Sequence, residues 1–149
     1  MDGKLKAYQT ADTLGKSQLD LIIKVYDGAI TSLRQTREQF EKEEYNNGRI
    51  HLEKANKFVT HLFTTLDMEK GGEIAEQLSK LYAFTINQMN VIDATKDLNA
   101  IDENITVLSN LRDGWVDLKT AQQEQIQENN SDEQKQTQQE QTINIEMSA

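Results

Sequence analysis

The chain has 149 residues and a mass of 17.0 kDa, which suffices for one domain with a substantial core. It contains neither proline nor cysteine and only seven glycines, a composition that suits long helices, disfavours a β-sandwich and excludes disulfides and thiolate chemistry. The formal net charge is −9, of which residues 121–149 contribute −5 through six acidic residues and one lysine. The remainder is mildly acidic and has no basic run, which argues against nucleic acid as a partner.

The first predicted elements are an arm and a long helix. Residues 1–16 have few apolar side chains and predict an N-terminal arm, extended rather than regular. Ser17 is typical of a helix N-cap, so we predict a helix from there to about residue 43. Its core-facing apolar residues form one wide stripe: Leu19, Ile22, Ile23, Tyr26, Ile30, Leu33 and Phe40. Leu21 and Val25 lie outside that stripe, on a second apolar track that also contains Gly28.

Three further helices are predicted, over about residues 49–66, 73–94 and 100 to the low 120s. Polar turns at 45–48 and 67–72 precede the first two, and an N-cap at Asp97 or Asn99 precedes the last. In the third helix we expect Leu78 and Leu81 in the core, with Tyr82 and Ile86 widening one edge. The fourth helix repeats the second track of the first, and its members are Val107, Leu111 and Leu118.

The order of these elements predicts an all-α fold, an antiparallel four-helix bundle with an N-terminal arm. The bundle would span residues 17–121. Residues 122–149 are polar with almost no apolar side chains, and such a segment cannot bury enough surface to offset its ordering entropy. We therefore predict a disordered or frayed-helix tail.

No pattern of catalytic or metal-binding residues is found. His51 and His61 do not share a helix face, and neither follows a glutamate by three positions as in di-iron bundles. The acidic turn after Leu66 lacks the closing glutamate of a calcium loop. The sequence thus predicts a protein that is not an enzyme and uses no metal or cofactor. It has neither an apolar signal sequence nor an apolar run of about 20 residues, so we expect a cytoplasmic protein without membrane insertion.

The second apolar tracks allow two interpretations. They belong to a thick core, or to surface covered by loops and the arm. Alternatively, they line a groove for an amphipathic helix of another protein. Tyr8 and Leu14 in the arm fit both, because an arm can occupy such a groove until a partner displaces it.

Five segments together resemble the FliS family of flagellin export chaperones, in one unbroken order: AYQTADTL (7–14), SQLDLIIKVYDGAITSL (17–33), LEKANKFVTHLFTTLD (52–67), GGEIAEQLSKLYAFT (71–85) and LRDGWVDL (111–118). The Tyr-Asp-Gly-Ala-Ile run that begins at Tyr26, the Leu-Tyr pair that ends at Tyr82 and the Arg-Asp-x-Trp that ends at Trp115 are the most specific of these.

The resemblance implies a helical bundle that binds the C-terminal segment of newly made flagellin in the bacterial cytoplasm. It implies that such a protein prevents premature polymerisation and aids type III export, with the flagellar export gate as a further partner. Tyr8 matches the family's arm tyrosine. We predict that the partner contacts the outer tracks and the arm, at Tyr8, Leu14, Leu21, Val25, Tyr82, Ile86, Val107, Leu111 and Leu118. A monomer is expected when free; the alternative is a helical scaffold that self-associates through the same tracks.

Overall fold

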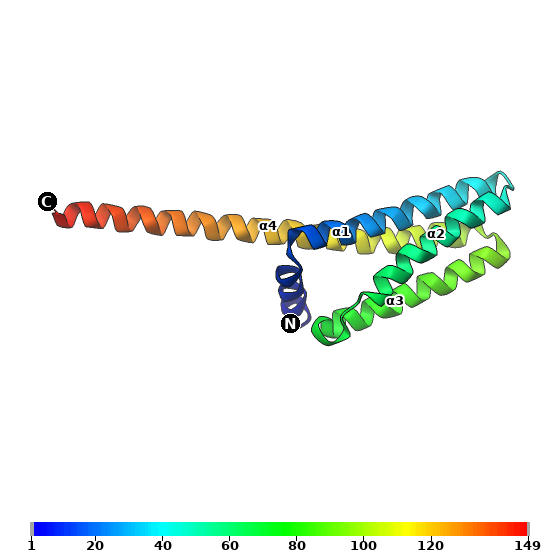
Figure 1. Cartoon of the computed structure of the whole chain (residues 1–149), viewed down its shortest axis with the longest axis horizontal. Coiled ribbons are helices and arrows are strands. Elements are labelled where there is room, and N and C mark those ends of the chain that lie inside the picture. Colours follow the sequence, from blue (N-terminus) through cyan, green and yellow to red (C-terminus); the bar gives the residue numbers. More distant parts are fainter. Residues whose placement is uncertain (1, 149) are drawn as a thin grey trace.

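The computed structural model describes the backbone of residues 2–148 and the side chains of residues 18–138 (Figure 1). The described chain forms four helices, α1 (Asp2–Glu41), α2 (Tyr45–Thr64), α3 (Met68–Thr95) and α4 (Leu98–Ser148). Helix α1 makes its largest interfaces with α2 and α4, and α3 completes the bundle. The predicted antiparallel four-helix bundle is confirmed. None of the described helices has the length and apolar character needed to cross a bilayer.

Both ends of the chain are more regular than predicted. The backbone of residues 2–17 is helical, so the prediction of an extended arm is wrong, and Ser17 lies inside α1 instead of capping it. These residues lack proline and include three Lys, two Ala and two Leu, which favour a helix. In Figure 1 these first turns are set at an angle to the rest of α1. Helix α4 likewise continues to Ser148 and projects well beyond the bundle, instead of ending in the low 120s.

Removing residues 124–149 is expected to leave the stability of the bundle unchanged. The side chains of residues 124–138 are all exposed, and the large apolar one among them, Ile126, is 54% exposed. Because the described side chains of this segment add little buried apolar area, the shortened chain should melt within about 2 °C of the full chain. Thermal unfolding followed by circular dichroism measures this. A drop of more than about 5 °C would show that the tail packs on the bundle.

The core follows the predicted stripe of α1, with Leu19, Tyr26 and Leu33 each 0% exposed. Gly28 lets Phe58 of α2 approach α1 closely, since a Cβ at this position would lie 2.8 Å from Cζ of Phe58. In α3 the prediction is wrong by one position: Leu81 is 37% exposed, whereas Tyr82 is 1% exposed. The hydroxyl of Tyr82 bonds with that of Tyr26 inside the bundle, so this tyrosine can be buried without an unpaired polar group.

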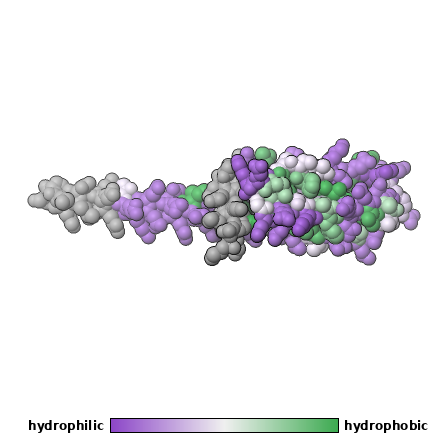
Figure 2. Space-filling view, turned by 90° about the horizontal axis from the view of Figure 1, so that it is seen from below, coloured by the Kyte–Doolittle hydropathy of each residue, from purple (hydrophilic) through white to green (hydrophobic). Residues whose placement is uncertain are grey.

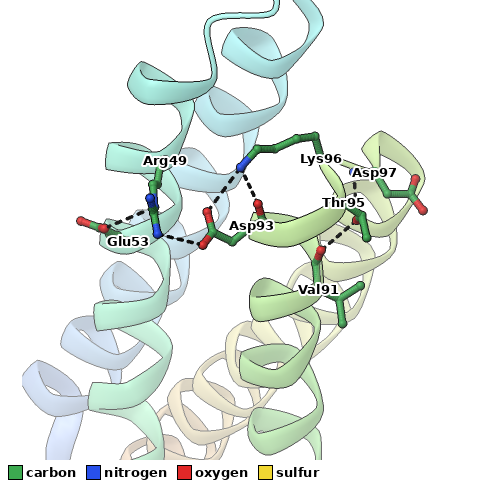
Figure 3. Close-up of polar contacts among 7 residues, drawn as sticks. All are labelled: Arg49, Glu53, Val91, Asp93, Thr95, Lys96 and Asp97. Atoms are coloured by element: carbon green, nitrogen blue, oxygen red, sulfur yellow. Dashed lines mark hydrogen bonds and ion pairs between the residues drawn. The ribbon is translucent and has the colours of Figure 1, made fainter.

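The helix turns at one end of the bundle are closed by polar contacts (Figure 3). Asp97 caps α4, since its Oδ1 accepts from the backbone N–H of Asn99 at 2.9 Å. Lys96 ends α3 in the left-handed region at φ 59°, donates from Nζ to the backbone oxygen of Asp93, and lies 5.1 Å from the ring centroid of Phe40. Arg49 Nη2 of α2 donates to Asp93 Oδ2 at 3.2 Å. Contacts of Asp93 and Lys96 therefore tie α3 to α2 and α1 at this end of the bundle.

Candidate partner-binding groove

The opposite end of the bundle is open. Helices α2 and α3 diverge there from the α1–α4 pair, toward the short connection between them (Figure 1). Asp67 caps α3 by accepting from two backbone N–H groups, and Gly72 kinks the helix at φ 53°, a region that favours glycine. An apolar groove of about 630 Å³ lies between the four helices at this end.

Helices α1 and α4 form one wall of the groove with large apolar side chains. Leu21 of α1 is 60% exposed, although a leucine usually lies inside. Leu111 and Leu118 of α4 are half-buried and line the same groove. The structure thus brings these three predicted contact residues together. They come from two helices that are far apart in the sequence.

Two aromatic residues of the groove lining, Tyr82 and Trp115, are hydrogen-bonded to the fully buried Tyr26. Trp115 Nε1 donates to the Tyr26 hydroxyl at 3.1 Å, and that hydroxyl also bonds with the hydroxyl of Tyr82. Burial raises the pKa of both tyrosines above its usual value near 10, and for Tyr82 the neighbouring Tyr26 adds to the shift. Both phenols therefore stay neutral at physiological pH, and the cluster acts as a rigid, uncharged base for the apolar walls.

Ion pairs between α1 and α4 hold the wall in register. Asp27 Oδ1 accepts from Arg112 Nε at 2.5 Å, and Asp20 pairs with Lys119. These groups are partly exposed, so each pair contributes little to stability, but they fix which residues of α1 and α4 face one another. The lining of the groove itself is mainly apolar, and its polar members include Gln18, His61, Asp67 and Asn110.

Other predicted contact residues lie elsewhere. Tyr82 lines the groove, but it is only 1% exposed. It therefore offers a partner little contact surface and mainly supports the other lining residues. Val25, Ile86 and Val107 are half-buried outside the groove, and the first two pack against the core. The remaining two, Tyr8 and Leu14, lie outside the residues whose side chains are described.

Sequence reasoning missed part of the lining. Trp115 and Leu66 are not among the predicted contact residues, but both pack on the core and line the groove. Gly114 was missed entirely. The signal was the spacing of Leu111, Trp115 and Leu118, which puts all three on one face of a helix.

A second apolar surface lies on the outside of α3. Leu81, Phe84 and Val91 are 37%, 40% and 48% exposed and follow one side of that helix. Figure 2 views the molecule from the side on which α3 lies, and shows apolar surface between hydrophilic flanks. Among the described residues no cluster of three or more His, Asp or Glu side chains could hold a metal ion.

Comparison with known proteins agrees with this geometry. The sequence model of a family described as flagellar protein FliS matches residues 1–123. The chain belongs to the FliS family. The match covers the whole bundle and all residues of the groove, and it leaves out most of the projecting part of α4.

Individual FliS relatives are of similar length. The flagellar secretion chaperone FliS of Salmonella typhimurium is 33% identical over 116 residues, which cover 74% of this chain and 86% of the relative. The flagellar secretion chaperone FliSB of Pseudomonas aeruginosa is 30% identical over 95 residues, covering 64% and 75%. The crystal structure of a flagellar chaperone from bacteria is similar with a TM-score of 0.63 and 23% sequence identity. The match covers 75% of this chain and 94% of the other, and it shows the same fold.

Proposed function

We propose that this chain is a flagellar secretion chaperone that binds the C-terminal segment of flagellin in the bacterial cytoplasm. Bound there, the segment is kept from polymerising early and is delivered to the type III export apparatus, with the export gate as a further partner. Family membership and the names of the relatives support the class of function. The observation that carries the proposal is the open apolar groove between the four helices at one end of the bundle.

The proposed mechanism is the docking of an amphipathic helix in the groove. A flagellin terminus that is unfolded alone would lay its apolar face against Leu21, Leu111 and Leu118. Burial contributes about 25 cal/mol per Å² of apolar area removed from water. Ordering the segment costs several kcal/mol, about 2–5, which keeps the complex releasable at the export apparatus. No catalytic step is needed, so the chain acts by binding alone.

Calorimetric titration with a peptide from the C-terminus of the organism's flagellin tests the proposal. We expect one saturable binding event with a negative heat-capacity change, because apolar surface is buried. A peptide of the same composition in scrambled order is the control. Absence of binding by the flagellin peptide, or equal binding by the scrambled one, would rule out the proposed client.

Deleting residues 1–15 is expected to tighten that binding several-fold. The proposal is that the arm, through Tyr8 and Leu14, competes with the client for the groove, so the full chain must first release it. The same titration, performed on the full and shortened chains, measures the difference. Unchanged or weaker binding would remove the arm from the mechanism without affecting the groove.

Self-association is the competing function, because the exposed stripe of Leu81, Phe84 and Val91 offers surface to a second copy. A chaperone of the proposed kind is monomeric when free. Light scattering on an eluting column separates the two, since a scaffold would elute as a dimer or larger species at micromolar concentration.

A further inference from the structure

Gly114 is a glycine that the chain's own fold does not require. It lies in the interior of α4, where glycine is about 1 kcal/mol less favourable than alanine. The other described glycines have a reason: Gly28, Gly48 and Gly71 each have a neighbour that a side chain would overlap, and Gly72 has a positive φ. A Cβ built on Gly114 would meet nothing within 4 Å.

The open space above Gly114 belongs to the groove. Gly114 lines it together with Leu111, Trp115 and Leu118. These positions are related as i, i+3, i+4 and i+7, and four residues so spaced form the hole that receives one side chain of a facing helix in knobs-into-holes packing. Leu111, Leu118 and the indole of Trp115 form the sides of this hole. Because Gly114 has no side chain, the hole is deeper than it would be with any other residue there.

We propose that Gly114 is a specificity-determining residue, which forms the pocket for one large apolar side chain of the bound helix. This inference rests on the proposed function, because the occupant is the flagellin segment. Leu21 lies on the α1 side of the same groove and, at 60% exposure, is free to cover the inserted side chain. A leucine, isoleucine, phenylalanine or methionine fits the apolar sides of this hole, whereas a charged side chain would be desolvated without a partner.

Two substitutions of Gly114 test the inference with the flagellin C-terminal peptide and the full-length chain. Gly114→Met fills the hole with a flexible apolar side chain, and Gly114→Ala fills it only slightly. Thr120→Met is the control, because Thr120 is exposed on the same helix and does not line the groove. Titration calorimetry measures the Kd, and thermal unfolding measures the Tm of each free variant.

We expect Gly114→Met to raise the Kd about tenfold and Gly114→Ala about threefold, with Thr120→Met unchanged. Gly114→Ala should raise the Tm of the free chain by about 3 °C, because alanine favours the helix. If the wild-type chain binds the peptide and Gly114→Met binds it with the same Kd, this inference is overturned and the proposed function is unaffected. A lower Tm of Gly114→Ala would also overturn it, since the fold would then need the glycine. Failure of the wild-type chain to bind would overturn both.

Discussion

Replacing Leu21 by aspartate is expected to weaken binding of the flagellin C-terminal peptide about 100-fold while leaving the fold intact. Leu21 is 60% exposed, so the free chain loses little when its side chain changes. In the complex, the same position would place a carboxylate against an apolar helix face, losing the burial of a leucine and desolvating a charge without a partner. Titration calorimetry measures the affinity, and circular dichroism checks the fold.

Ile50→Asp is the matched control for Leu21→Asp. Ile50 is an exposed aliphatic residue of nearly equal exposure, 63%, but it lies on α2 outside the groove. The same change of charge and hydrophobicity there should alter the Kd less than twofold. Equal losses in the two variants would show that general surface charge, and not the groove, determines the affinity.

Removing the hydroxyl of Tyr26 is expected to destabilise the bundle more than removing that of Tyr82. The Tyr26 hydroxyl accepts from Trp115 Nε1 and bonds with Tyr82, so Tyr26→Phe loses two hydrogen bonds under the groove. Tyr82→Phe loses one of these and leaves the bond between Trp115 and Tyr26. At about 1 kcal/mol for each buried hydrogen bond, the losses should be about 2 and 1 kcal/mol.

Urea unfolding of the two single variants and the double variant measures these differences. Because both substitutions remove the Tyr26–Tyr82 bond, the double variant should lose less than the sum of the single losses. If the losses of unfolding free energy are additive, or if Tyr82→Phe loses more than Tyr26→Phe, the hydrogen-bonded hydroxyls do not stabilise the bundle as their geometry indicates.

The bundle could be predicted from the sequence because its helices carry long apolar stripes with helical spacing. The stripe of α1 placed Tyr26 and Leu33 correctly. The polar link before α4 offered Asp97 or Asn99 as its cap, and the structure has Asp97. The prediction failed in α3, where Leu81 and Tyr82 are neighbours and both are apolar enough for a core. Periodicity alone could not show that Tyr82 has a buried hydroxyl partner 56 positions away.

The site was only partly predictable. Surplus apolar residues identified Leu21, Leu111 and Leu118 as one surface, because each lies off the main stripe of its helix. The groove itself depends on the divergence of α2 and α3 from α1 and α4. This divergence is a feature of the tertiary structure and cannot be predicted from the periodicity of one helix. For the same reason Val25 and Val107, which share the spacing of the contact residues, lie outside it. The full lengths of α1 and α4 were not predicted, because the prediction relied on apolar stripes, whereas helix propensity also favours a helical backbone beyond them.

The central claim, that the flagellin segment lies in this groove, is tested most directly by the indole N–H signal of Trp115 in a nitrogen–proton NMR spectrum. The chain has one tryptophan, so the signal is single, and Trp115 lines the groove with its N–H hydrogen-bonded to Tyr26. Adding a tryptophan-free flagellin C-terminal peptide should shift this signal in proportion to the bound fraction measured by calorimetry. Saturable binding with an unmoved indole signal would contradict the claim and place the client on another face of the bundle.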